Sequence, residues 1–90
     1  KQIIQIVAKT MHVKEREILG KGRNMQIALA RQICMFLSKN LINLSLSSIG
    51  AQIGKRDHST AIHAYKTIEK KMKNDVELKQ IISKIEEKII

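Results

Sequence analysis

The sequence predicts an all-α domain, a compact bundle of about six helices that contains a helix-turn-helix. A chain of 90 residues suits one small domain, and a hydrophobic content of 43% is enough for a folded core. The chain has no proline and only four glycines, so little interrupts a helix. Apolar residues recur at helical spacing along most of its length. We therefore expect residues 1–90 to form a single domain.

Two short amphipathic helices are expected first. Residues 1–12 place their apolar side chains on one helical face. These side chains are Ile3, Ile4, Ile6, Val7 and Met11. A second helix covers residues 14–19, with Ile18 and Leu19 expected to point inward and Gly20 expected to end it.

The longest helix is expected from Met25 to about Leu41, after a basic loop of residues 21–24. Its inward stripe follows the spacing of one helix face and comprises Ala30, Ile33, Cys34, Leu37 and Leu41. Arg31, Gln32 and Lys39 lie off this stripe, on a face suited to gripping phosphates, although exposed basic residues are common on any helix. A single cysteine forms no intrachain disulfide, and Cys34 is interpreted as a small core residue.

The helix-turn-helix is expected in residues 45–72. Ser45 is a suitable N-cap for a helix of about two turns, which Gly54 ends. Its inward residues are Leu46, Ile49 and Ile53, and Gly50 is interpreted as permitting a close helix contact. After a short turn, Asp57 caps a second helix. The inward stripe of that helix is Ala61, Ile62, Tyr65, Ile68 and Met72.

A last helix is expected to begin at Asn74 or Asp75. Its apolar face comprises Val76, Leu78, Ile81, Ile82, Ile85 and Ile89. Much of the acidity of the chain lies here, in Glu77, Glu86 and Glu87. We therefore expect one cationic side and one more neutral side of the domain.

Residues 54–60, Gly-Lys-Arg-Asp-His-Ser-Thr, gather cations, a capping carboxylate and short hydroxylated side chains at the expected start of the second helix. Short polar side chains at a helix start, flanked by basic residues, are typical of a helix that reads the major groove of DNA. Asp57 has two interpretations that are compatible, a helix cap and a base contact.

The net charge of +9 comes from 17 Lys and Arg against 8 Asp and Glu, and it favours an anionic partner. Only two aromatic residues are present, which disfavours the stacking of single-stranded bases. No apolar run approaches the length of a membrane span, so no membrane insertion is expected. A helical protein-interaction module, docking a regulator through its basic or isoleucine-rich face, is the alternative. A basic helix lying on a membrane surface is disfavoured because the helices are short.

Two patterns mimic other sites. Residues 50–55 resemble a phosphate-binding loop but are one residue short of it, and Arg56 stands where a magnesium-binding hydroxyl is required. His58 and His63 are five residues apart, so they do not stack on one helix face as metal ligands at i and i+4 do. We expect no catalytic residue, no metal and no cofactor in this chain.

Three segments together resemble a known family. Gly54, residues 56–60 and residues 62–64 resemble the signature of the carboxy-terminal domain of the bacterial replication initiators of the DnaA family. Residues 30–38 resemble the long central helix of that family, and residues 46–50 resemble the first helix of its helix-turn-helix. The resemblance runs in order over essentially the whole chain.

The resemblance implies a Trp-repressor-like fold that binds A/T-rich double-stranded DNA elements, the DnaA boxes, at the replication origin. It implies that Arg23 enters the minor groove, while Asp57, His58 and Thr60 meet bases in the major groove. The phosphate contacts that it implies are Arg31, Gln32, Lys39, Ser59 and His63, with Leu46 and Ser47 lying against the strand. Lys55 and Arg56 complete the predicted DNA-binding set. Lys55 replaces a second glycine usual in the family, and it either adds a phosphate contact or stiffens the turn.

The resemblance also implies an ATPase module of the AAA+ type that is not in these residues, so ATP or ADP is not expected to bind here. The chain begins at Lys1, which suggests a piece of a longer protein. Replication regulators are expected as further partners, and the isolated domain is expected to be monomeric. The implied location is the bacterial cytoplasm, in association with the nucleoid.

Overall fold

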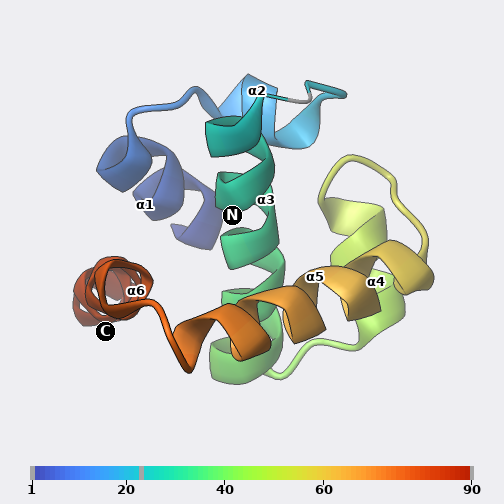
Figure 1. Cartoon of the computed structure of the whole chain (residues 1–90). Helices are drawn as coiled ribbons and strands as arrows, with labels where there is room; N and C mark the ends of the chain where they lie inside the picture. Colours follow the sequence, from blue (N-terminus) through green and yellow to red (C-terminus); the bar gives the residue numbers. More distant parts are fainter. Residues whose placement is uncertain (1, 23, 90) are drawn as a thin grey trace.

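A computed structural model describes residues 2–22 and 24–89, and across them the chain forms six α-helices, one π-helical turn and no strand (Figure 1). The elements are α1 (Gln2–Met11), α2 (Glu15–Leu19), α3 (Met25–Leu37), the π-helix η1 (Ser38–Ile42), α4 (Leu46–Gln52), α5 (His58–Met72) and α6 (Val76–Ile89). The predicted all-α architecture is confirmed.

Helix α3 is the centre of the arrangement, and α1, α2 and α5 all pack against it (Figure 1). Helix α5 crosses one end of α3 and carries α4 on its flank, while α6 packs on α1 and α5. Ile33, Cys34 and Leu37 of α3 are completely buried by these neighbours. The helix-turn-helix is therefore mounted on the most enclosed helix of the domain.

The core draws aliphatic side chains from every α-helix. Its largest fully buried members are Val7, Ile18, Ile33, Met35, Leu37, Ile49, Ile68, Ile82 and Ile85. Each such side chain contributes roughly 1.5–3 kcal/mol through its removal from water. Burial raises the pKa of the Cys34 thiol to about 12, so the thiol stays neutral and serves as a small core side chain, as predicted.

An aromatic pair fixes α5 against α3. The rings of Phe36 and Tyr65 are stacked with centroids 5.1 Å apart and an interplanar angle of 27°. The Tyr65 hydroxyl donates a hydrogen bond to Asn40 Oδ1 in η1, at 3.2 Å. Both aromatic residues of the chain thus support the crossing of α5 over α3 and are not displayed for base stacking.

The predicted helix starts are confirmed by capping hydrogen bonds. Ser45 Oγ accepts from the backbone N–H of Ser48 at 3.1 Å, at the start of α4. Asp75 Oδ1 accepts from the backbone N–H of Leu78 at 3.0 Å, at the start of α6. A short side chain with an acceptor oxygen satisfies a backbone donor that the first helical turn leaves unpaired.

Three residues predicted to point inward are exposed instead: Leu19 at 39%, Leu41 at 42% and Val76 at 66%. Leu41 leaves the stripe because η1 bonds Asn43 N–H to Ser38 O, five residues back, and this wider turn breaks the 3.6-residue period. Leu19 is the last residue of α2 and Val76 is the first residue of α6, so both lie at helix ends beyond the part that packs on the core. Ala8 and Ala64, which the pattern did not single out, are buried.

Candidate nucleic-acid interface

Helices α4 and α5 meet through a turn that requires a glycine at position 50. A Cβ atom built on Gly50 would collide with the carbonyl oxygen of Arg56 and lie 2.7 Å from that of Asp57. The N–H of Arg56 donates to Gly50 O at 2.6 Å. The turn is therefore seated directly on the backbone of α4, and the predicted close contact at Gly50 is confirmed.

The turn contains two consecutive residues with left-handed backbone. Gly54 has φ of +77° and Lys55 has φ of +55°. Glycine adopts this conformation freely, whereas a side chain at this φ costs on the order of 1–2 kcal/mol. The strain at Lys55 is the physical reason why a glycine suits position 55, and the Lys55 side chain itself is exposed.

Asp57 caps α5 with both its backbone and its carboxylate. Its Oδ1 accepts from the N–H of Thr60 at 3.1 Å and from the Thr60 hydroxyl at 3.0 Å. These bonds, the backbone bond first, hold the pKa of the Asp57 carboxyl below its usual range. Both bonds end on Oδ1, which leaves Oδ2 for another donor. The Thr60 hydroxyl hydrogen is used, so Thr60 keeps its methyl group and its oxygen lone pairs for a partner.

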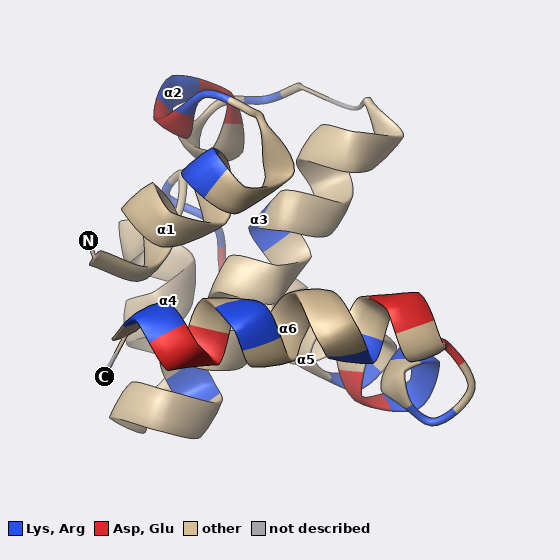
Figure 2. Ribbon diagram, turned by 90° about the vertical axis from the view of Figure 1, so that its left-hand side faces the viewer, with Lys and Arg blue, Asp and Glu red and all other residues tan. Residues whose placement is uncertain are grey.

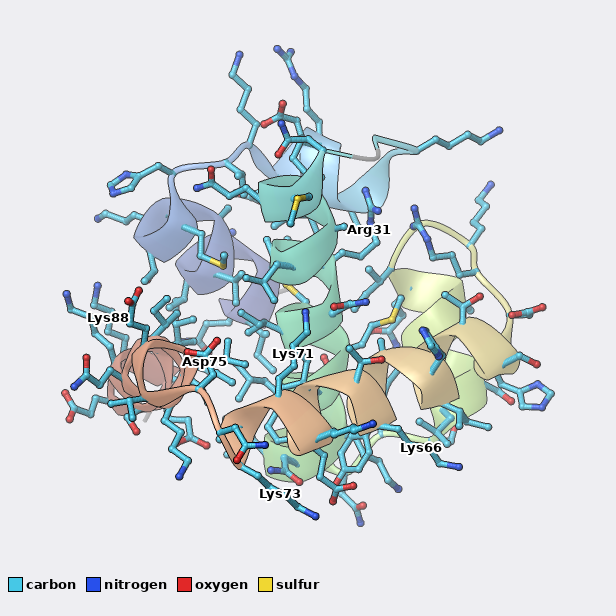
Figure 3. All side chains as sticks on the ribbon, viewed as in Figure 1. Arg31, Lys66, Lys71, Lys73, Asp75 and Lys88 are labelled. Carbon is cyan, nitrogen blue, oxygen red and sulfur yellow. The ribbon has the colours of Figure 1, made fainter. Side chains whose placement is uncertain are left out.

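The leading end of α5 separates an outer polar face from an inner apolar face. His58, Ser59, Thr60 and His63 are all exposed, whereas Ala61 is completely buried. Small alanines on the inner face let α5 approach its neighbours closely, so the polar side chains at its start face solvent as predicted. Lys66 continues the exposed face along the helix (Figure 3).

The remaining predicted residues surround this end in several elements. Gln32 on α3 and Lys39 in η1 are half-buried. Leu46 is half-buried at the first position of α4, beside the exposed Ser47. Arg23, the predicted minor-groove residue, lies outside the residues that the structure describes. The loop around it ends at Asn24, whose Oδ1 caps α3 by accepting from Gln26 N–H at 2.8 Å, a cap that the sequence pattern did not single out.

Arg31 is placed differently from the expectation of a free phosphate-binding cation. Its Nε donates to Ile18 O at 2.7 Å and its Nη1 to Gly22 O at 3.1 Å. Its Nη2 donates to Glu17 O at 2.9 Å and to Gly20 O at 3.1 Å. Figure 3 shows the side chain beside α3, below the loop that joins α2 to α3. Burial, and then the positive charge of Arg56, lowers the pKa of Arg31.

Arg56 is likewise turned into the protein. Its Nη1 donates to Ile53 O at 2.9 Å and its Nη2 to Gly20 O at 2.5 Å. The four hydrogen bonds of Arg31 and the two of Arg56 all end on backbone carbonyl oxygens. Sequence periodicity did not reveal this, because the acceptors are backbone atoms of a distant helix end.

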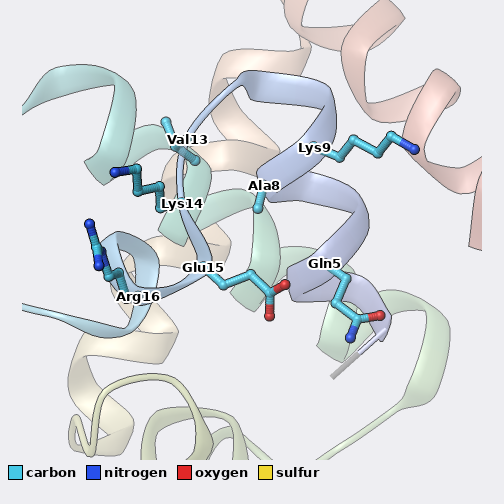
Figure 4. Close-up of a pocket in the computed structure, with 7 residues that line it drawn as sticks. All are labelled: Gln5, Ala8, Lys9, Val13, Lys14, Glu15 and Arg16. Carbon is cyan, nitrogen blue, oxygen red and sulfur yellow. The ribbon is translucent and has the colours of Figure 1, made fainter.

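An open hollow lies between α1 and α2, lined by Gln5, Ala8, Lys9, Val13, Lys14, Glu15 and Arg16 (Figure 4). Its rim is charged and it belongs to elements outside the helix-turn-helix. Within residues 2–22 and 24–89, no three His, Cys, Asp or Glu side chains gather in a way that would hold a metal ion. Over the same residues, no helix combines the length and the apolar character needed to cross a bilayer.

A capped helix with an exposed polar start, seated through a glycine-dependent turn on a shorter helix, defines a helix-turn-helix domain. Domains of this class place the second helix in the major groove. The family model described as "Bacterial dnaA protein helix-turn-helix" matches residues 1–68, and the chain belongs to this family.

Three relatives named chromosomal replication initiator protein DnaA match most of the chain. The protein from Methylacidiphilum infernorum is 42% identical over 83 residues, which is 92% of this chain and 18% of the relative. The protein from Lactiplantibacillus plantarum is 46% identical over 76 residues, covering 84% and 17% respectively. The protein from Lactococcus lactis subsp. cremoris is 41% identical over 88 residues, covering 98% and 19%.

The chain therefore spans less than a fifth of the length of these relatives. The matched region is a helix-turn-helix region, and the chain is a non-catalytic domain.

Proposed function

We propose that this domain binds double-stranded DNA at A/T-rich DnaA boxes and so contributes to the initiation and regulation of DNA replication. In this proposal the leading end of α5 enters the major groove and the basic loop after α2 lies in the minor groove. One observation carries the proposal: α5 exposes His58, Ser59, Thr60 and His63 at a rigidly capped end that is seated on α4.

Base reading is assigned to three residues at that end. Oδ2 of Asp57 can accept from an exocyclic amine, and the imidazole of His58 can donate or accept at a base edge. The methyl group of Thr60 suits contact with a thymine methyl, because its hydroxyl hydrogen is held by Asp57. Each good base contact contributes roughly 1–3 kcal/mol of discrimination.

Phosphate contacts supply the larger, sequence-independent part of the affinity. We assign them to Gln32, Lys39, Lys55, Ser59 and His63, with Leu46 and Ser47 against the strand. The net charge of +9 supports a strong electrostatic term. With about five or six phosphates neutralised, the logarithm of the affinity should fall with the logarithm of salt concentration at a slope near −5.

Fluorescence anisotropy with a DnaA-box duplex and a scrambled duplex, across a salt series, tests the proposal. We expect tighter binding to the box and a steep salt dependence on both duplexes. Lys39→Ala should weaken both duplexes equally and make the slope shallower by about 0.9, the value for one phosphate. Equal affinity for the two duplexes, or affinity independent of salt, would refute box recognition.

The alternative is a helical module that docks a regulator through its basic or isoleucine-rich face. On α6, Leu78, Ile82 and Ile85 are each at most 3% exposed and belong to the core, whereas Val76 is 66% exposed and Ile81 and Ile89 are half-buried, so only part of this face is free for a partner. Regulators could still meet the basic surface, and a regulator that competes with the duplex would reveal such binding.

The whole protein is proposed to carry the ATPase module outside these residues, and to act in the bacterial cytoplasm in association with the nucleoid. The isolated domain is proposed to be a monomer that binds no nucleotide. Sedimentation of the domain alone, with and without ATP, tests both statements.

A further inference from the structure

We propose that Arg31 and Arg56 are positioning residues that fasten the loop after α2 to the turn of the helix-turn-helix, so that the loop and α5 meet the duplex as one rigid unit. The inference rests on the proposed function for its consequence in DNA binding. The fastening of the loop to the turn is inferred from hydrogen bonds that the domain makes without DNA.

The two guanidinium groups meet at one backbone oxygen. Gly20 O accepts from Nη2 of Arg31 at 3.1 Å and from Nη2 of Arg56 at 2.5 Å. Arg31 lies 11 residues along the chain from Gly20, on the central helix, and Arg56 lies 36 residues away, in the turn. A single carbonyl thus joins three separate segments: the end of α2, the middle of α3 and the turn between α4 and α5.

Each arginine also holds its own side of this junction. Arg31 adds bonds to the carbonyls of Glu17, Ile18 and Gly22, so it closes the end of α2 and the first residues of the loop. Arg56 adds a bond to Ile53 O, the residue that follows α4. The carbonyls at a helix end lack intrahelical partners and carry partial negative charge, which two cations satisfy here.

Gly54 shows that the turn and α2 are in direct contact. A Cβ atom on Gly54 would collide with Nη1 of Arg56 and would lie 2.7 Å from the carbonyl oxygen of Leu19. The position of the turn relative to α2 is therefore set both by the shared carbonyl and by close backbone packing. The loop that leaves α2 at Gly20 starts from a point fixed relative to α5.

The chemistry of this junction requires arginine and not just positive charge. The planar guanidinium presents five donors in a fixed fork, so one side chain can reach several carbonyls at once. A lysine keeps the charge but offers one compact ammonium group on a flexible stem. A phosphate anchor would tolerate lysine far better than a fork that spans Glu17, Ile18 and Gly22.

The test compares Arg56→Lys and Arg31→Lys with Arg16→Lys, the matched control on the exposed surface of α2. Amide hydrogen exchange without DNA should accelerate at residues 20–22 and 54–57 in the first two variants, while the core of α3 stays protected. Coupling between two sites is commonly 5–150-fold, and we expect affinity for the DnaA box to fall about tenfold with an unchanged salt slope. Arg16→Lys should match the wild type in both measurements.

Two results would overturn the proposal. One is wild-type exchange at residues 20–22 in both variants, which would show that the arginines do not hold the loop. The other is normal box affinity in the lysine variants together with a slope shallower by about 0.9 in Arg56→Ala, as expected for a phosphate anchor. If Arg31→Lys does not fold, Arg56→Lys carries the test, since its side chain makes fewer bonds. The exchange measurement tests whether the arginines hold the loop, and it does so even if the wild type does not prefer the box. Absence of box preference in the wild type would refute the proposed function but not the fastening.

Discussion

Helices α5 and α6 are almost equal in length, 15 and 14 residues, and each buries an aliphatic stripe, but their outer faces differ. Helix α6 carries three lysines and three glutamates, which are intermixed along its length (Figure 2). Helix α5 carries three lysines and one glutamate, and its first turn exposes the polar side chains of His58, Ser59 and Thr60, of which Thr60 is bonded to the capping Asp57. A balanced outer face keeps α6 soluble, whereas a polar, cationic outer face gives α5 a surface complementary to a polyanion.

Both helices therefore contribute to the core, but the proposed recognition surface lies on α5 alone. The next four predictions test this difference, beginning with the largest expected effect.

Ile82→Ala should remove a nearly completely buried side chain from α6 and leave a cavity. We expect a loss of about 2–5 kcal/mol in the free energy of unfolding, measured by urea denaturation. The ratio of affinities for box and scrambled duplex should stay at the wild-type value under conditions where the variant is folded. A changed ratio would show that α6 takes part in recognition.

His58→Ala should have the opposite effect. Because His58 is exposed, the free energy of unfolding should change by no more than about 0.5 kcal/mol. The preference for the box over the scrambled duplex should fall by roughly 1–3 kcal/mol, the contribution of one base contact, in the anisotropy assay. His12→Ala is the matched control, an exposed histidine after α1. An intact preference in His58→Ala would remove His58 from the base-reading set.

Lys55→Gly addresses the strained turn between the two helices of the motif. Glycine removes the strain of the left-handed backbone at φ of +55° but raises the conformational entropy of the unfolded chain. We therefore expect a net increase of about 0.5–1 kcal/mol in the free energy of unfolding, measured by thermal denaturation. If Lys55 contacts a phosphate, the salt slope becomes shallower by about 0.9 in the same variant. An unchanged slope together with higher stability would assign Lys55 to the turn alone.

Asp57 supplies the smallest effect, a pH dependence. Its pKa is lowered in the folded domain, so its contribution to stability is complete above the unfolded pKa of about 4 and is lost as pH falls through the lower folded value. Asp57→Asn keeps a capping side chain that does not titrate. The difference in melting temperature between wild type and variant should therefore be constant near neutral pH and change only below about pH 4. A difference that is constant over the whole range would contradict the capping role of the carboxylate.

Local chemistry made several features predictable. Ser45, Asp57 and Asp75 were recognisable as helix starts because a cap depends on a side chain and a backbone N–H only three residues apart. The exposure of His58 and His63 followed from helical periodicity, because the inward stripe of α5 occupies the opposite face.

Features that depend on distant segments were not predictable in the same way. Leu41 was assigned to the core because a 3.6-residue period was continued through residues that form a π-turn. The hydrogen bonds from Arg31 to the carbonyls of Glu17 and Ile18 were not expected, because backbone acceptors have no signature in side-chain patterns.

The sequence by itself determined the helical class, the position of the helix-turn-helix and the residues at the start of α5, since these depend on spacing and short-range hydrogen bonds. Only the tertiary structure decided which cations face outward. Arg31 and Arg56 turn inward because the unpaired carbonyls at the end of α2 are brought to them by packing. Whether a charged side chain points outward or inward therefore depends on the acceptors that tertiary packing brings within its reach.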